Sequence, residues 1–256
     1  MVYTAFQAGL ILYKGGKIWI MIYVISDLHG YPVEQLQKLL QKAGFSDNDF
    51  LYILGDVIDR NGDGGTAMLC WLLEQPNVQL VLGNHEAMLL SCDFVFDEIT
   101  EESIETITAE KLAILNTYLC NGGDVTLRAL RALCKESPHR VAGILTYLRE
   151  APLYEAVTAG EHDFLLVHSG IDGFDKTKKL SQYPADSFLW AWPSLEDEYF
   201  DDIITVFGHT PTMSFGKEYT GKIIKTRTWI DIDVGAGFGQ EAVLLRLDDF
   251  EEFRLS

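Results

Sequence analysis

Hydrophobic residues in the first third of the chain fall into short runs, separated by stretches with helical spacing. The runs are rich in β-branched and aromatic residues and end in glycine, aspartate, asparagine or histidine, which is typical of buried strands. They cover residues 22–26, 50–54 and 78–82. Between them, residues 33–40 and 67–72 each place apolar side chains on one helical face. This alternation predicts βαβ units and therefore an α/β fold.

The pattern changes between residues 93 and 150, where acidic residues and helix formers replace the β-branched runs. Helices are predicted near residues 110–119, 125–135 and 138–149, and we interpret the segment as a helical insertion or lid. Strands are predicted again at 153–157, 164–168, 203–207, 229–234, 242–247 and 251–255. Since no repeat or low-complexity linker divides the chain, we expect residues 21–256 to form a single domain.

Residues 1–20 stand apart from this pattern. They are apolar in parts, yet Lys14 to Lys17 interrupt them before any membrane-spanning length is reached, and no small-residue cleavage site follows. Met21 directly precedes the first predicted strand. Residues 1–20 are therefore interpreted either as a leader from an upstream start or as an extra edge segment, and not as a membrane anchor.

The charge balance narrows the function classes. The chain has 38 acidic and 20 basic residues and a formal charge of -18, which disfavours non-specific binding of nucleic acid. A phosphate-bearing substrate would need bound divalent cations to reverse this repulsion locally. The four cysteines form no paired zinc motif or disulfide framework, so a reducing cytoplasm is the expected location. The oligomeric state stays open.

Polar clusters stand at or beside the ends of five predicted strands, and together they hold four of the six histidines. Any one of them is more readily explained as a turn, because Asp, Asn and Gly are ordinary turn residues. Five in succession make that explanation improbable. Carboxylates and imidazoles suit Mn, Fe or Zn, and the two oxygens of a carboxylate such as Asp56 can bridge two cations. The clusters are residues 27–30, 55–60, 83–86, 167–170 and 208–211.

These clusters read Asp-x-His, Gly-Asp-x-x-Asp-Arg, Gly-Asn-His-Glu, a strand-end His and Gly-His-Thr-Pro, in that order. The series resembles the phosphoprotein-phosphatase branch of the calcineurin-like metallophosphoesterases, from about Ile22 to Leu247. The resemblance implies two mixed β-sheets packed face to face, with helices outside. It also implies two divalent metal ions, of which manganese is expected, with iron or zinc as alternatives.

Carried over by position, the resemblance implies that Asp27 and His29 bind one metal and that Asp56 bridges to the second. The second metal would be held by Asn84, His168 and His209. His85 would be the general acid, oriented by Asp59, and Arg60 would hold the phosphate. The family's reaction is attack on phosphorus by a metal-bridging hydroxide.

The chain departs from the family pattern at two places. A second phosphate-binding arginine is usual shortly after a Leu-Trp pair, but Trp192 stands there, and Asn61 precedes Gly62 after the Asp-Arg pair. Either another cation completes the phosphate site or the substrate is not an ordinary phosphomonoester. Trp192 could pack in the core or stack on an aromatic group. The candidate cations are Lys176, Lys178, Lys179 and Arg227.

We expect a metal-dependent phosphatase acting on phosphomonoesters, with phosphoprotein Ser/Thr phosphatase activity as the first hypothesis. The alternatives are a hydrolase of symmetrical dinucleoside tetraphosphates and a non-catalytic phosphate-binding scaffold. Glu86 counts against the tetraphosphatase, because the resembling members of that group tend to have Asp at this position.

Overall fold

The βαβ pattern of the first third forms the centre of one sheet. The computed structural model describes residues 11–13, 16–18, 20–98 and 100–256. Strands β3 (Ile22–Ile25), β4 (Phe50–Ile53) and β5 (Val78–Leu80) are parallel, linked by helices α1 (Val33–Lys42) and α2 (Thr66–Leu72). Strands β11 (Leu244–Arg246) and β12 (Glu252–Phe253) extend the sheet in antiparallel fashion, giving the order β12-β11-β3-β4-β5.

The second sheet is built from the later strands and is also mixed. Its order is β6-β7-β8-β10-β9, with β7, β8 and β10 parallel and the two edge strands antiparallel. The strands are β6 (Tyr154–Ala159), β7 (His162–Val167), β8 (Ile203–Phe207), β9 (Ile224–Lys225) and β10 (Trp229–Asp231).

The two sheets pack face to face because their strands are apolar on both faces. In β3, Ile22 and Val24 lie in the core between the sheets, while Tyr23 and Ile25 lie in the core beneath the helices. Phe164 and Leu166 of β7 enter the same inter-sheet core from the opposite side. Successive side chains of a strand point to opposite faces, so continuous apolar runs are required where both faces are covered. The predicted two-sheet fold is confirmed.

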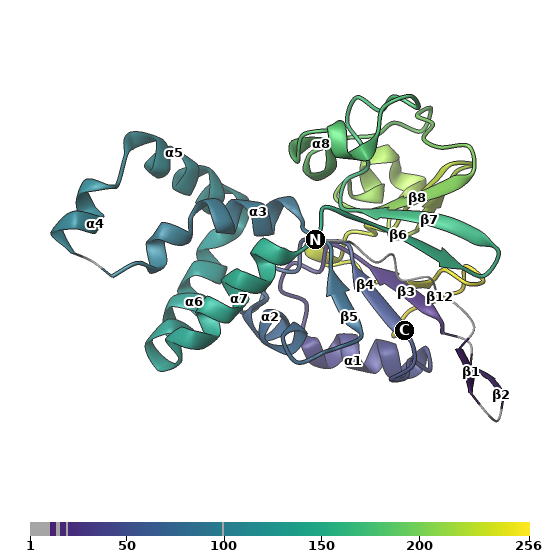
Figure 1. Ribbon diagram of the computed structural model, residues 1–256, viewed down its shortest axis with the longest axis horizontal. Coiled ribbons are helices and arrows are strands. Elements are labelled where there is room, and N and C mark those ends of the chain that lie inside the picture. The colour runs from purple at the N-terminus through teal and green to yellow at the C-terminus, as the bar shows by residue number, and fades with distance from the viewer. Residues whose placement is uncertain (1–10, 14–15, 19, 99) are drawn as a thin grey trace.

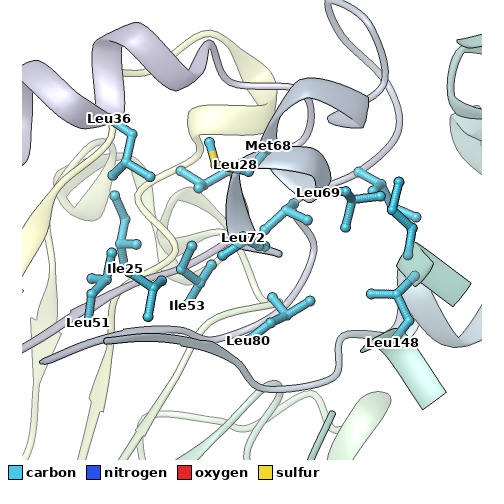
Figure 2. Packing of buried hydrophobic residues seen from close by; sticks show 14 of the residues in the cluster. Ile25, Leu28, Leu36, Leu51, Ile53, Met68, Leu69, Leu72, Leu80 and Leu148 are labelled. Atoms are coloured by element: carbon cyan, nitrogen blue, oxygen red, sulfur yellow. The ribbon is translucent and has the colours of Figure 1, made fainter. Parts of the chain in front are cut away.

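Helices cover the outer face of the first sheet. Figure 2 shows Leu36 of α1 and Leu72 of α2 beside Ile25, Leu51 and Ile53 of the strands. Leu148 of α7 reaches the same cluster from the segment that follows β5. The outer face of the second sheet is covered by the loops around η3 (Leu180–Gln182) and α8 (Asp186–Leu189).

The segment between β5 and β6 is helical, as its sequence predicts. It contains α3 (Asn84–Ser91), η1 (Asp93–Phe96), α4 (Glu101–Glu105), α5 (Ala109–Tyr118), a π-helical turn η2 (Leu119–Gly123), α6 (Asp124–Glu136) and α7 (Pro138–Glu150). Helices α4 and α5 extend farthest from the sheets (Figure 1), whereas α6 and α7 pack back towards α2.

Some predicted boundaries differ from the structure. Strand β10 ends at Asp231 and not at residue 234, because the Asp231 side chain accepts a hydrogen bond from the backbone N–H of Asp233 and turns the chain. The two-residue strand β9 has no periodic pattern and was not predicted. The expectation for residues 1–20 falls mostly outside the described residues; within it, β1 (Ile11–Tyr13) and β2 (Gly16–Ile18) form a separate antiparallel pair. Among the described residues, no helix is long and apolar enough to cross a membrane.

Candidate active site

The polar clusters lie on the loops that leave the carboxyl ends of strands in both sheets. Asp27 and His29 follow β3, Asp56 follows β4, and Asn84 opens α3 after β5. His168 follows β7 and His209 follows β8, so the second sheet contributes the remaining two. Five of the six residues are almost wholly buried, with exposed fractions of 3% or less, and His209 is half-buried. We call these six residues the buried centre.

The backbone of this region adopts conformations that side chains ordinarily avoid. Asp27, His29, Asp56 and His209 all have positive φ, between 40° and 68°, and so do the neighbouring Asp59 and Arg60. Among the described non-glycine residues, only Phe250 shares this feature. Each such residue costs about 1–3 kcal/mol, and this cost persists only where surrounding structure enforces it. The strain is therefore concentrated where the polar side chains converge.

Glycines permit the close approach of these loops. A Cβ on Gly208 would lie 2.1 Å from Asp27 Oδ2, and one on Gly83 would lie 2.3 Å from Asp56 Oδ1. Such distances exclude any larger residue without movement of the loops. The glycines that precede Asn84 and His209 in the sequence clusters are thus required by packing against the neighbouring carboxylates.

One group of ligand atoms gathers around Asp56, His168, His209 and Asn84. His168 Nε2 lies 2.8 Å from Asn84 Oδ1 and 3.5 Å from Asp56 Oδ1. Its Nδ1 lies 2.7 Å from the Leu54 carbonyl, so Nδ1 carries the proton and Nε2 presents a lone pair. His209 Nε2 is buried without a hydrogen-bond partner. The acceptors around Asn84 can be satisfied by its NH2 group, turned towards His168 and Asp56, or by a bound cation.

A second group lies on the other side of Asp56. His29 Nε2 is 3.6 Å from Asp56 Oδ2, and His29 Nδ1 lies 2.9 Å from the Ile58 carbonyl, which orients its lone pair in the same way. His85 Nε2 is 3.9 Å from the same Asp56 oxygen. The potential ligand atoms of His29, Asp56 and His85 lie within 4.8 Å of one another, as do those of Asp56, His168 and His209. Asp56 is common to both groups.

One carboxylate oxygen of Asp27 makes a contact between the two sheets. Its Oδ2 accepts a hydrogen bond from the His209 backbone N–H at 2.9 Å, which ties the two sheets together. It is not a member of either close group of potential ligands among the described residues.

Burial sets the protonation of the buried centre. Burial and the neighbouring histidines lower the pKa of His168, and burial lowers the pKa of His209 to about 4. Both rings are therefore neutral at pH 7 and can donate lone pairs. Burial and the charge of Glu86 raise the pKa of Asp56, which makes the carboxylate costly to ionise in the absence of a cation.

His85 belongs to a hydrogen-bonded chain that leads away from the buried centre. Its Nδ1 lies 2.7 Å from Asp59 Oδ2, and Asp59 Oδ1 accepts hydrogen bonds from Tyr118 at 2.8 Å and from Thr126 at 2.5 Å. Arg60 Nη2 lies 3.2 Å from His85 Nε2. Tyr118 and Thr126 were not identified from the sequence, because they belong to the helical segment 59 and 67 residues away from Asp59.

Glu86 faces away from the centre and holds the loop after β4. Its carboxylate is fully buried and accepts hydrogen bonds from the backbone N–H groups of Asp56, Val57 and Gly83. These contacts fix the strained turn that carries Asp56.

Above the buried centre lies a cleft of about 280 Å³. Three exposed aromatic side chains border it, Trp190, Trp192 and Phe238, and we call them the aromatic rim. Arg60 is the one cationic side chain among the described residues that line it, with its guanidinium 5.0 Å from the Phe238 ring centre. The remaining lining residues are Asp56, Asn84, His85, Asn121, His209, Pro211, Met213 and Ser214.

The structure shows where Trp192 and the four candidate cations lie relative to the cleft. Core packing of Trp192 is wrong, since the side chain is 65% exposed. None of the four candidate cations lines the cleft: Lys176 and Arg227 pair with Asp201, and Lys178 lies over Tyr183, while Lys179 is exposed. Asn61 donates to the Gly237 carbonyl and links the Arg60 loop to the aromatic rim.

This arrangement of carboxylates and imidazoles has a counterpart among known proteins. The profile of the calcineurin-like phosphoesterase family matches residues 20–231. The chain belongs to this family. It is therefore a metal-dependent phosphoester hydrolase, and the members of the family use a dinuclear metal centre.

Curated relatives of this phosphoesterase share one name. The chain is 24% identical over 275 residues to a symmetrical bis(5'-nucleosyl)-tetraphosphatase of Pasteurella multocida, covering 90% of this chain and 95% of the relative. Similar proteins of the same name occur in Haemophilus ducreyi, with 29% identity over 74% of this chain and 58% of the relative, and in Buchnera aphidicola. The Buchnera match is 39% identical but spans only 27% of this chain and 25% of the relative.

Solved structures of low sequence identity share the phosphoesterase fold. A protein named provisionally as a diadenosine tetraphosphatase superposes with a TM-score of 0.59 at 17% identity, covering 92% of each chain. A yeast serine/threonine phosphatase with similarity to human PP5 superposes with a TM-score of 0.54 at 15% identity, covering 89% of this chain and 72% of the other.

Proposed function

We propose that this phosphoesterase hydrolyses dinucleoside polyphosphates, with symmetrical tetraphosphates as the preferred substrates. The shared name of its curated relatives supports this alternative over the phosphoprotein hypothesis placed first by the sequence. The cleft is the observation that carries the proposal. It offers one arginine with three exposed aromatic side chains, a composition suited to a substrate with both phosphate and aromatic bases.

The residues of the buried centre would hold two divalent cations, with manganese proposed and iron or zinc as alternatives. Asp56 would bridge them, since it is shared by both groups of potential ligands. Asn84, His168 and His209 would complete one site, and Asp27 and His29 the other. When bound, such ions activate water and neutralise charge on the phosphoryl group.

His85 is the proposed proton donor to the leaving phosphate. His85 lines the cleft, and the Asp59 carboxylate on its Nδ1 fixes the orientation of the ring. Tyr118 and Thr126 hold Asp59 in turn. Arg60, anchored against Phe238, presents its guanidinium to the substrate phosphates.

Glu86, which counted against a tetraphosphatase in the sequence, does not contact the cleft. Its carboxylate serves backbone N–H groups and lies outside the residues that line the cleft. The identity of this residue therefore bears on the geometry of the loop and not directly on the choice of substrate. The four free cysteine thiols agree with the proposed cytoplasmic location.

The test is a substrate panel assayed with Mn²⁺: diadenosine tetraphosphate, a phosphoserine peptide and an aryl phosphate. We expect diadenosine tetraphosphate to have the highest kcat/KM and to yield ADP as the sole nucleotide, with Asp56→Asn as the inactive control. A higher kcat/KM on the phosphopeptide would overturn the proposal in favour of a protein phosphatase. Metal binding without turnover of any substrate would indicate a non-catalytic scaffold.

A further inference from the structure

Two tryptophans stand exposed at the edge of the cleft, just after the short helix α8. Trp190 is 43% exposed and Trp192 is 65% exposed. A tryptophan side chain carries a large apolar surface, and leaving it in water forgoes the free energy that its burial would provide. Exposed aromatic groups beside an active-site cleft therefore point to a ligand that covers them.

The backbone holds Trp192 in this outward position. Its neighbours Ala191 and Pro193 are both buried, and the Ala191 backbone N–H donates to the Ser169 hydroxyl at 2.9 Å. Ser169 directly follows His168, so the anchor belongs to the loop that supplies the buried centre. The Trp192 ring is thus displayed by a fixed loop, which lowers the entropic cost of binding to it.

Trp192 also lies directly beside the proposed metal ligands. Its ring centre is 5.7 Å from that of His209, at an interplanar angle of 74°, and Trp190 is 6.0 Å from the same ring. A group stacked on the outer face of Trp192 would be close to a phosphate bound over Asp56 and His209. The short distance between the Trp192 ring and His209 therefore suits the base and the phosphate of one nucleotide.

Trp192 forms a wall between two cavities of unlike character. On its far side lies a second cavity of about 330 Å³, lined by Trp192 together with three acidic residues, Asp172, Asp197 and Glu198. Glu198 pairs with Arg227 at 3.0 Å and Asp197 accepts a hydrogen bond from the Ser194 backbone N–H, so Asp172 is the carboxylate that can repel phosphate and accept hydrogen bonds from the amino groups of a base. Asp172 has no hydrogen-bond or ion-pair partner for its carboxylate among the described residues. The charge difference across Trp192 thus favours phosphates on one side and a base on the other.

We propose that Trp192 is a specificity-determining residue that stacks a nucleobase of the substrate next to the phosphate-binding cleft. This inference rests on the proposed function and adds the residue through which a nucleotide is distinguished from a bare phosphate ester. Trp190 lines the phosphate-binding cleft but not the second cavity, so the stacking role is assigned to Trp192 alone.

Binding measurements test the inference independently of turnover. With Mn²⁺ present, calorimetry would compare AMP with ribose 5-phosphate, which lacks only the base. Base stacking on an aromatic side chain predicts that the wild-type protein binds AMP about 5- to 100-fold more tightly. Trp192→Ala should remove most of this preference and leave ribose 5-phosphate unaffected. Trp192→Phe should retain most of it, because an aromatic face remains. Leu112→Ala, at another exposed apolar residue, 53% exposed on α5, is the matched control and should change neither affinity.

Kinetics then separate this inference from the proposed function. Trp192→Ala should raise KM for diadenosine tetraphosphate by a similar factor with little change in kcat, and should leave kcat/KM for inorganic tripolyphosphate unchanged. An unchanged AMP preference in Trp192→Ala, or no preference in the wild type, overturns the stacking role whatever the enzyme hydrolyses. A Trp192-dependent preference for AMP without hydrolysis of diadenosine tetraphosphate upholds the stacking role and overturns the proposed substrate.

Discussion

The buried centre and the aromatic rim meet in one cleft, yet they are built in opposite ways. The buried centre is nearly inaccessible, strained in its backbone and fixed by hydrogen bonds to carbonyl groups. The aromatic rim is exposed, with Phe238 at 56% and Trp192 at 65%. Reaction chemistry depends on exact placement of ligands, whereas recognition of a substrate needs a surface that is free to be covered. The buried centre therefore indicates the class of reaction, and the aromatic rim indicates the kind of substrate.

The largest loss of activity is expected from replacing Asp56, which is shared by both groups of potential ligands. Asp56→Asn should lower kcat/KM on every phosphoester substrate by at least about 10,000-fold, because several kcal/mol of charge stabilisation depend on the cations. Elemental analysis should find less than two equivalents of metal. Asp47→Asn, on an exposed turn, is the control. Full metal content with normal turnover would contradict the bridging role.

His85→Asn probes the boundary between the buried centre and the cleft. If His85 donates a proton, the variant should retain both metals and lose about 100- to 10,000-fold in rate on an alkyl phosphate. The loss on an activated aryl phosphate should be much smaller, since that leaving group needs no proton. His139→Asn, at an exposed histidine, serves as the control. Equal losses on both substrates together with reduced metal content would instead make His85 a ligand, which its proximity to His29 and Asp56 also permits.

Tyr118→Phe tests whether the helical segment supports the chemistry. Removing the hydroxyl takes one hydrogen bond from Asp59, and we expect kcat on an alkyl phosphate to fall about 10-fold at constant metal content. Tyr147→Phe, which removes a hydroxyl bonded to the Leu80 backbone, should leave kcat unchanged. The supporting role of Tyr118 would be refuted by equal kcat values for the two variants.

The smallest expected effect is that of Asp56 on the free energy of unfolding of the metal-free protein. Burial raises the pKa of Asp56, so this carboxyl group destabilises the metal-free protein at a pH above its ordinary pKa, and the penalty disappears as the pH falls towards about 4. In chelator at pH 7, Asp56→Asn should therefore be more stable than the wild type by about 1–2 kcal/mol. With Mn²⁺ the order should reverse, because only the wild type gains fully from binding. Thermal unfolding with and without metal checks the reversal; the same order under both conditions would argue against a metal at Asp56.

The sequence predicted the buried centre better than its surroundings, for a physical reason. Asp27, Asp56 and His168 each follow an apolar run that predicts a strand, and the carboxyl ends of these strands, two in the first sheet and one in the second, bring their loops together. Tyr118 and Thr126 reach Asp59 from helices whose patterns mark only an amphipathic surface. Trp192 was left undecided because the sequence does not show that Ala191 and Pro193 are buried on either side of it. Contacts that depend on the packing of distant elements leave no pattern in the local sequence.

The hydrogen bond from the His209 backbone to Asp27 has a consequence for how the protein matures. It joins residues 182 positions apart, and His168 likewise lies against Leu54, 114 positions earlier. During synthesis, the parallel strands β3, β4 and β5 can pair long before the loop that carries His209 leaves the ribosome, whereas β11 and β12 join the same sheet after it. The complete set of proposed metal ligands then comes together only when the second sheet docks onto the first. Acquisition of metal would accordingly mark chains in which both sheets have folded and docked.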